Sequence, residues 1–536
     1  MSTLLSFLPP FPSLPSPLTP LLATLAALAG ALLLFPLLRL ARRRPSPHRR
    51  PPSAAAPLPL LGHALSYHAS PTAFLLSQRS RIGPIFKLNL AGRRVVVVCG
   101  GREAAKKVAT AAERVLSARR AMEAVGLGES LGAVNVGLGA EFHRKVLKEG
   151  MGAAATAELA PSVLAAIGAA VGVELEAAVE RGGEVADLMA MVRRCMVRCV
   201  VAMFIGSEVL RRLGDSFVHD FIAFHDAAEN ATLKAALLPH ALALPLFLLP
   251  VARKRRKITS QLAAAIASLL KDRKEVQNGT QSNLDASFGA GPWIRAFEFF
   301  RLETEDAAEL SAGLLFSAHK SSAIGATQAF LFCHEQGGEL LRQAVEDSRK
   351  VHRCPRNDKG ITLDLSDTLR RCVKEALRLT AHPIGAVRTV VSPKGFLLPA
   401  PDGEPYWVAP GEMIALSHIA VHLDEAEWGA DAAQFNPERQ RWSTPRAPDE
   451  YAHATFSQGV HKCPGEHMAL MMMRSALAVL LGGEYEITPA MPLPPLSSER
   501  TTLAQRAAAV AVRVRRATGE AGAADLTACM PCDPPS

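Results

Sequence analysis

The stretch FSQGVHKCPG, residues 456–465, decides the fold, and it is followed by a helical run that begins at Glu466. A cysteine just before a helix N-terminus has its thiolate stabilised by the helix dipole and by backbone N–H groups. Gly459 and Gly465 allow the backbone to turn sharply and to approach a flat cofactor closely. A buried thiolate held in this way suits a haem iron, to which it donates electron density. We therefore expect Cys463 to ligate iron, although a lone cysteine in a loop is usually only a packed side chain.

Two further motifs lie upstream of this loop. Glu375-Ala-Leu-Arg378 places an acid and a base at i and i+3 on one face of a helix. Phe435-Asn-Pro-Glu-Arg439 follows at a distance that allows a second guanidinium to reach the same carboxylate. An acid and a base spaced as Glu375 and Arg378 are usually only part of a solvated helix face, so the weight rests on the order of the motifs along the chain.

The order Glu-x-x-Arg, Phe-x-Pro-x-Arg, Phe-x-x-Gly-x-x-x-Cys-x-Gly resembles the cytochrome P-450 family of haem-thiolate enzymes. The resemblance extends over most of the chain, from an apolar leader and proline hinge to the Cys463 loop. It implies a mainly α fold with a smaller β portion. It also implies haem b, iron protoporphyrin IX, as the cofactor, with Cys463 as the axial ligand.

The resemblance further implies the roles of individual residues. Ala140 stands where the family commonly has a tryptophan, so one propionate contact is expected to be missing. The expected propionate contacts are His461, Arg388 and Arg144; the expected haem loop residues are Phe456, Gly459 and Gly465; the expected structural triad behind the haem is Glu375, Arg378 and Arg439.

The segment 314–322, LLFSAHKSS, occupies the place of the family's distal helix, where an acid and then an alcohol relay protons. Ser321 stands at the alcohol position and Lys320 at the acid position, so both are candidate catalytic residues. A lysine replaces a carboxylate in a relay only if its pKa falls on burial; the alternative is that Lys320 points away into a salt bridge. The pattern is nearest to the sterol 14α-demethylase and prostacyclin synthase branch, although residues 117–139 lack the aromatic-rich signature of the sterol demethylases.

Composition excludes several classes of protein. The formal charge, 60 − 50 = +10 over 536 residues, is modest, and aromatic residues make up only 5% of the chain. A nucleic-acid-binding platform of basic and aromatic residues is therefore not expected. A hydrophobic fraction of 49% with 21% charged residues excludes wholesale disorder. Nine irregularly spaced cysteines indicate reduced thiols rather than a disulfide framework.

The amino terminus predicts a membrane anchor. Residues 18–40 are apolar enough to span a bilayer, and arginines crowd the following residues 42–50. By the positive-inside rule the downstream chain is cytoplasmic, which predicts a single-pass protein of the endoplasmic reticulum membrane, with the plastid envelope as the alternative. We expect a lumenal leader at 1–17, the anchor at 18–40, a basic and proline-rich linker at 41–62, the catalytic domain at 63–516 and a disordered tail at 517–536.

Local patterns predict the main elements. Residues 83–99 are typical of a β-hairpin that turns at Ala91-Gly92, and strand-like sequence returns at 386–415. Helical periodicity marks 155–205, 255–275, 304–333 and 366–380, and 420–462 is irregular. Three prolines in the apolar run 235–251 argue against a spanning helix there. That run is either a buried loop or a hydrophobic lip on a membrane.

The resemblance implies a monooxygenase that inserts one oxygen atom from O2 into a hydrophobic substrate such as a sterol, a fatty acid or a terpenoid-like molecule. Its electrons come from NADPH through a flavoprotein reductase. A first alternative is a reductase-independent haem-thiolate isomerase or lyase that acts on lipid hydroperoxides, which needs no proton relay at Lys320. A second alternative is a haem-binding sensor that turns nothing over.

Overall fold

The computed structural model describes residues 48–517, except 59–60, 138–151, 237, 239, 278–290, 356–357, 359–362, 365, 444–450 and 498. The predicted leader, the anchor at 18–40 and residues 518–536 of the predicted tail lie outside this range, as do Arg144 and Ala140. The described chain from Arg50 onward forms one compact unit.

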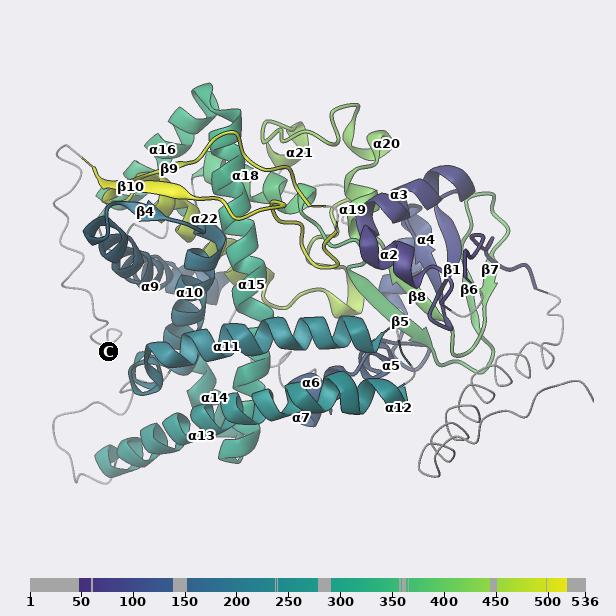
Figure 1. Cartoon of the computed structure of the whole chain (residues 1–536), viewed down its shortest axis with the longest axis horizontal. Helices are drawn as coiled ribbons and strands as arrows, with labels where there is room; N and C mark the ends of the chain where they lie inside the picture. The colour runs from purple at the N-terminus through teal and green to yellow at the C-terminus, as the bar shows by residue number, and fades with distance from the viewer. Residues whose placement is uncertain are drawn as a thin grey trace, which may run out of the picture. The chain divides into compact units, whose positions relative to one another are not determined.

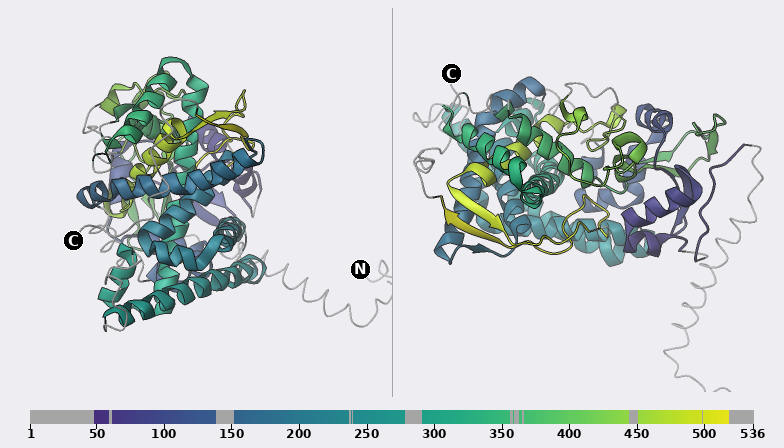
Figure 2. Two further views of the ribbon diagram at one scale, coloured as in Figure 1. Left: turned by 90° about the vertical axis from the view of Figure 1, so that its left-hand side faces the viewer. Right: turned by 90° about the horizontal axis from the view of Figure 1, so that it is seen from above.

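This unit is mainly helical with a smaller β portion, as expected (Figures 1 and 2). The helices before the central helix are α2 (Ala64–Ala69), α3 (Pro71–Ile82), α4 (Arg102–Thr110), α5 (Ala118–Ala124), α6 (Leu127–Leu131), α7 (Ala133–Gly137), α9 (Ala153–Glu180), α10 (Leu188–Val200), α11 (Ser207–Ala235), α12 (His240–Ala243), α13 (Leu249–Gln277) and α14 (Pro292–Phe300). The others are α15 (Thr304–Gln336), α16 (Gly338–Arg353), α18 (Asp367–Leu379), α19 (His418–His422), α20 (Glu425–Trp428), α21 (Gln440–Ser443) and α22 (Glu466–Gly482).

The β portion contains the predicted hairpin, β1 (Ile85–Leu90) and β2 (Arg93–Val98), joined at Ala91-Gly92. It belongs to a five-stranded sheet of order β1-β2-β8-β5-β3, in which β8 (Met413–Leu416) lies parallel to β2. The remaining strands are β3 (Leu116–Ser117), β5 (Ala386–Val390), the hairpin β6 (Phe396–Leu398) and β7 (Tyr406–Val408), and the sheet β4 (Glu184–Val185), β10 (Val512–Arg516) and β9 (Tyr485–Pro489).

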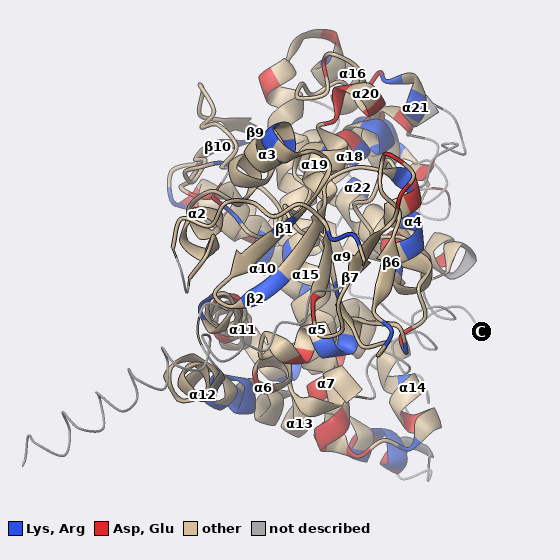
Figure 3. Ribbon diagram, turned by 90° about the vertical axis from the view of Figure 1, so that its right-hand side faces the viewer, with Lys and Arg blue, Asp and Glu red and all other residues tan. Residues whose placement is uncertain are grey.

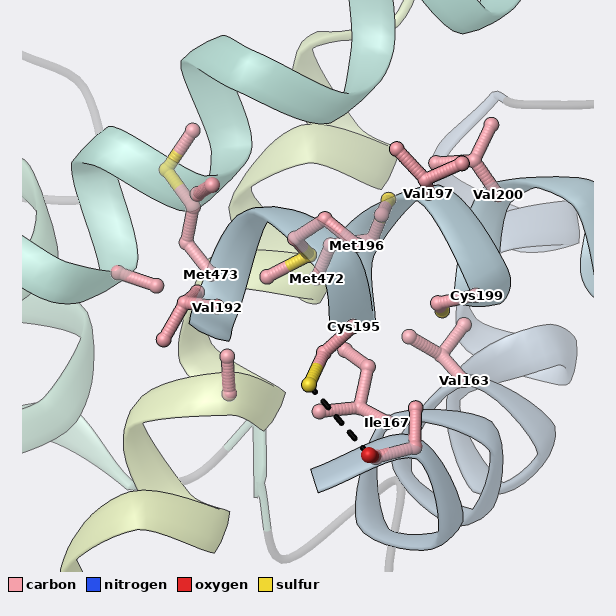
Figure 4. Close-up of a cluster of buried hydrophobic side chains, with 14 of the residues drawn as sticks. Val163, Ile167, Val192, Cys195, Met196, Val197, Cys199, Val200, Met472 and Met473 are labelled. Atoms are coloured by element: carbon pink, nitrogen blue, oxygen red, sulfur yellow. Dashed lines mark hydrogen bonds between the residues drawn. The ribbon is translucent and has the colours of Figure 1, made fainter. Parts of the chain in front are cut away.

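The main hydrophobic core lies where α9, α10, α15 and α22 pack against one another. Figure 4 shows part of it, where Val163 and Ile167 of α9 meet Cys195 of α10 and Met472 of α22. The segment Thr156–Glu180 of α9 is long and apolar enough to cross a membrane by length and composition, the only such helix within the described ranges. Its buried residues contribute to this core.

Close packing fixes the central helix α15 against two neighbours. A Cβ added at Gly325 would lie 2.5 Å from the Met473 sulfur of α22 and 3.0 Å from a Leu377 methyl of α18. A side chain at this position would have to displace the ends of Met473 and Leu377, so glycine allows the close packing of α15 on α22 and α18. Farther along α15, the Asn135 amide of α7 donates to the Glu309 carbonyl oxygen at 2.7 Å.

The structure corrects two of the local predictions. The helix predicted over 155–205 is interrupted, because Gly182 and Gly183 adopt φ of 101° and 76° and the chain enters β4. The buried-loop interpretation of 235–251 is wrong, since α12, the π-helical segment Leu244–Leu248 and the start of α13 occupy most of it. Pro245 falls at the start of the π-helical segment and Pro250 at the start of α13, and neither proline ends the helical run.

Candidate functional site

The Cys463 loop connects a short 3-10 turn, Gly459–His461, to the N-terminus of α22. The Cys463 N–H donates to the Phe456 carbonyl oxygen at 2.8 Å, which closes the loop on itself. Burial raises the pKa of the Cys463 thiol, while a hydrogen bond from the Gly465 N–H lowers it in part. Desolvation thus outweighs the helix N-terminus for the thiol, and a thiolate here needs a positive partner such as a metal ion.

The two loop glycines act differently from one another. Gly459 has φ of 69°, and a Cβ there would lie 2.2 Å from the Ala109 carbonyl oxygen of α4. Its small size therefore serves contact with α4 rather than close approach to a cofactor. Gly465 has no positive φ, and a Cβ there would only touch the Cys463 sulfur at 4.0 Å.

A buried ionic cluster lies behind the loop and joins the two upstream motifs. The Arg378 guanidinium donates to both oxygens of Glu375, at 2.9 and 2.7 Å, and Arg439 donates to the same carboxylate at 3.0 Å. The side chains of Glu375 and Arg378 are fully buried. The Trp442 indole N–H, which the sequence did not indicate, also donates to Glu375 at 2.9 Å. Such a saturated set fixes α18 to the segment that leads to the Cys463 loop.

The Arg378 guanidinium also holds the backbone beyond its own helix. It donates to the carbonyl oxygens of His422 and Ala432, both at 2.6 Å, and of Gln434 at 3.1 Å. His422 in turn contacts the Arg378 carbonyl through Nδ1 at 3.0 Å, while its Nε2 accepts from the Ala454 N–H at 2.9 Å. These partners assign the neutral tautomer with the proton on Nδ1. His422 therefore ties α19 and the approach to the Cys463 loop to α18.

This arrangement predicts a pH dependence of stability. Burial, His453 and Arg378 place the pKa of His422 well below its ordinary 6.5, so the unfolded chain takes up a proton that the folded chain does not. As pH falls below 6.5, His422 should therefore lower the free energy of unfolding by about 1.4 kcal/mol per pH unit. Urea denaturation at pH 7, 6 and 5 measures this slope.

The His422→Gln variant, whose amide keeps a donor and an acceptor, should lose that share of the slope. The exposed His219 of α11 offers a matched control, and His219→Gln should leave the slope unchanged. An unchanged slope in His422→Gln would show that this imidazole is not held neutral.

Two of the expected propionate contacts come together around one carboxylate. His461 Nε2 lies 3.2 Å from Glu113, and the Glu113 charge also acts on the Arg388 guanidinium of β5. Burial would raise the pKa of Glu113, but hydrogen bonds from Ser117 and from the N–H groups of Arg119 and Ala118, together with His461, lower it. The sequence analysis missed Glu113, which carries no motif of its own.

The Arg388 guanidinium lacks a full set of partners. It is 7% exposed and donates to the Val387 carbonyl oxygen at 2.8 Å, and among the described residues no carboxylate lies within ion-pair distance of it. Burial lowers the pKa of Arg388, and Glu113 raises it. Among the described residues, Glu113 is the carboxylate that acts on both His461 and the Arg388 guanidinium, and it forms no ion pair with Arg388. Together with the half-buried Cys463 thiol, these residues fit a haem with its propionates on this side.

The central part of α15 has one open face. Residues 310–315 and 322–333 are buried, whereas Ser317 is exposed and Ala318 and Ser321 are half-buried between them. Ser321 lies one turn from Gly325, the residue at which α15 contacts α22, so this face is directed toward the helix that Cys463 precedes. Ser317 donates to the Gly313 carbonyl oxygen at 2.9 Å. Sequence analysis missed Ser317 because exposure inside a core helix leaves no local signal.

Lys320 forms the salt bridge that the sequence analysis left open as its alternative. Its ammonium contacts Glu229 of α11, and Asp226 lies 3.9 Å away. The neighbouring His319 is fully buried, with Nδ1 2.7 Å from the Leu315 carbonyl oxygen and its ring 4.6 Å from that of His225. His319 is therefore a packed histidine, and Lys320 fastens α15 to α11.

Comparison with known proteins matches most of this chain to one family. The model of the Cytochrome P450 family matches residues 51–504. Lanosterol 14-alpha demethylase of Homo sapiens is 25% identical over 473 residues, which cover 84% of this chain and 85% of that protein. The mouse (Mus musculus) protein of the same name is 24% identical, with 82% of each chain covered. Sterol 14-demethylase of Arabidopsis thaliana is 23% identical over 83% of this chain and 87% of its own length. From the family match over residues 51–504, the chain is a member of the cytochrome P450 family of monooxygenases.

Proposed function

We propose that this enzyme inserts one oxygen atom from O2 into a hydrophobic, sterol-like substrate, with electrons from NADPH delivered by a flavoprotein reductase. The observation that carries the proposal is the half-buried Cys463 thiol at the N-terminus of α22, on the side toward which the open face of α15 is directed. The relatives named as sterol 14-demethylases support the sterol class, because they cover more than four-fifths of the chain.

Haem, when bound, supplies the activation of dioxygen, and the surrounding residues hold it. Cys463 would provide the sulfur that ligates the iron, and the Gly465 N–H, which donates to that sulfur, would temper its basicity. Arg388 and His461 would bind the propionates, while Glu113 orients His461 through their 3.2 Å contact. The cluster of Glu375, Arg378 and Arg439 keeps the loop at a fixed position relative to α18.

On the distal side, the Ser321 hydroxyl holds and passes protons at the open face of α15, since a hydroxyl both donates and accepts. Lys320 is a positioning residue: its ion pair with Glu229 links α11 to α15 one residue before Ser321.

Replacing Arg388 is expected to weaken the hold on haem. Arg388→Gln removes a buried charge that faces a propionate, and a hydrogen bond to a charged group is worth about 1.5–3 kcal/mol. We therefore expect haem loss to apomyoglobin to become about tenfold faster or more. Arg513→Gln, an exposed arginine of β10, makes the same charge change as a control and should leave the rate unaltered. Equal rates in both variants would remove Arg388 from the propionate site.

Replacing Ser321 is expected to slow turnover. A positioned proton donor contributes about 100-fold or more, so Ser321→Ala should reduce product formation by about that factor while NADPH consumption continues. Ser317→Ala alters a hydroxyl on the same face that is already bonded to Gly313, and it should have a much smaller effect. If the two variants behave alike, Ser321 has no special role as a relay.

We also propose that the protein is anchored in a membrane, with the domain boundaries that the sequence predicts. Residues 18–40 anchor the chain in the endoplasmic reticulum membrane and residues 63–516 form the cytoplasmic catalytic domain. Leu242, Leu246 and Leu249 support contact with lipid, because their side chains are 43%, 58% and 42% exposed on consecutive helical segments. Exposed leucines grouped in this way are typical of an interfacial surface.

A carbon monoxide difference spectrum tests the proposal. The purified protein is reduced either with NADPH and a reductase or with dithionite. A red-shifted thiolate–CO band under both reductants, followed by NADPH-dependent oxidation of a sterol, is the expected result. A band with dithionite alone, with turnover of a lipid hydroperoxide in the absence of NADPH, would instead support the isomerase. The absence of such a band under both reductants would overturn the thiolate assignment.

A further inference from the structure

A buried carboxylate in the β portion gathers several cations around it. Glu412, 1% exposed in the turn before β8, lies 3.0 Å from Lys87 of β1, 3.3 Å from Arg94 of β2 and 3.6 Å from Arg50. The Arg50 guanidinium is also stacked 4.6 Å from the centre of the Trp407 ring, which holds it in place. Arg50 and both strands of the β1–β2 hairpin thus present their positive groups at one carboxylate that lies more than 300 residues away along the chain.

The charges of this cluster are unbalanced. Three cations against one carboxylate, 3 − 1, leave a formal charge of +2. The excess of positive charge acts on Lys87. Its pKa is lowered, mainly by burial and also by Arg50 and Arg94, while Glu412 opposes this shift. The outer members remain accessible, with side chains 36% exposed at Arg50 and 42% exposed at Arg94. A second anion can therefore approach from solvent without displacing Glu412.

The position of the cluster points to the source of that anion. Arg50 follows the end of the predicted anchor by ten residues, a span of at most about 36 Å when fully extended. Arg93, the neighbour of Arg94 in β2, points to the other face of the sheet and donates to the Ala236 carbonyl oxygen, so the cluster lies on the sheet face with Trp407. Figure 3 shows the basic start of β2 on the face of the molecule that carries α12. A cationic site tethered this close to the predicted anchor matches the headgroup layer of a bilayer, where phosphate lies above the acyl chains.

We propose that Arg50, Lys87 and Arg94 bind the phosphate of an anionic membrane lipid. The inference goes beyond the proposed reaction and shares with it only the predicted anchor. Guanidinium groups match phosphate oxygens in geometry, and Lys87 adds a point charge from beneath. The anchor keeps the site at a high local concentration of headgroups, so a lipid outcompetes free phosphate from solution.

Native mass spectrometry of the full chain in detergent micelles tests this proposal, because it counts retained lipids without using activity. The protein is titrated with phosphatidic acid, with phosphatidylcholine and with inorganic phosphate. We expect the protein to retain one molecule of phosphatidic acid in preference to phosphatidylcholine. In Arg94→Gln the affinity for phosphatidic acid should be about fivefold weaker, which is the contribution of one cation near an anionic lipid surface. Arg513→Gln removes an equal charge on β10, which lies on the opposite side of Figure 1, and should bind as the original does.

The other outcomes contradict the proposal in distinct ways. Equal retention of both lipids, or an equal loss of affinity in Arg94→Gln and Arg513→Gln, would show nonspecific charge attraction. Displacement of the lipid by millimolar inorganic phosphate would identify a site for free anions instead. The carbon monoxide band after dithionite, recorded on the same samples, shows separately whether the haem site is intact, so failure here leaves the proposed reaction to its own test.

Discussion

Cys463→Ser is expected to abolish the red-shifted carbon monoxide band and to reduce turnover below detection. The serine hydroxyl is nearly the same size as the thiol, so the loop that Phe456 closes should survive. It remains protonated at neutral pH, however, and cannot donate electron density to iron as a thiolate does. Absorption spectroscopy of the dithionite-reduced protein with carbon monoxide measures the change directly.

A second cysteine provides the control for that experiment. Cys354 follows α16 and is half-buried, and Cys354→Ser should leave the band and the haem content unchanged. If Cys463→Ser keeps a red-shifted band, another residue holds the iron and the assignment of this loop is wrong. If the band disappears in both variants, the effect is a general loss of folding.

Glu375→Gln should be among the most destabilising single changes outside the loop. The Glu375 carboxylate receives hydrogen bonds from Arg378, Arg439 and Trp442, and its removal leaves the fully buried Arg378 without a countercharge. Leaving one partner of a buried pair unpaired costs about 3–5 kcal/mol. Urea denaturation followed by far-ultraviolet circular dichroism should show a loss of that size in the free energy of unfolding, with loss of haem at the same denaturant concentration.

A variant in an exposed ion pair is the control that distinguishes the cost of an unpaired buried charge from the loss of a charge in general. Glu339 and Arg342 of α16 form an i, i+3 pair whose side chains are both largely in solvent, and Glu339→Gln should leave the unfolding midpoint unchanged. A similarly small effect of Glu375→Gln would mean that Arg378 is sufficiently satisfied by the backbone carbonyls of His422, Ala432 and Gln434.

Local patterns were sufficient for those parts of the molecule that sequence neighbours determine. The β1–β2 hairpin follows from two β-rich runs and the Ala91-Gly92 turn, and α18 follows from its apolar periodicity. The contact between Glu375 and Arg439 could be expected only from the family resemblance, because the two residues lie 64 positions apart in the sequence. The tertiary fold, rather than any local sequence pattern, determines that the Arg439 guanidinium reaches the Glu375 carboxylate.

The features that sequence analysis missed depend on tertiary packing. Prolines in 235–251 predicted a buried loop or a membrane lip, but the chain at Pro245 and Pro250 is helical, with a π-helical segment between them. Lys320 at a relay position carried two interpretations, and only the approach of α11 with Glu229 distinguishes between them. Glu113 and Trp442 were missed because each becomes important through a partner more than 60 residues away along the chain.

The glycine at position 325 couples two parts of the enzyme that lie far apart in the sequence. A side chain there would have to displace the ends of Met473 on α22 and of Leu377 on α18. A single substitution in α15 would therefore disturb both the helix that Cys463 precedes and the helix that carries Glu375.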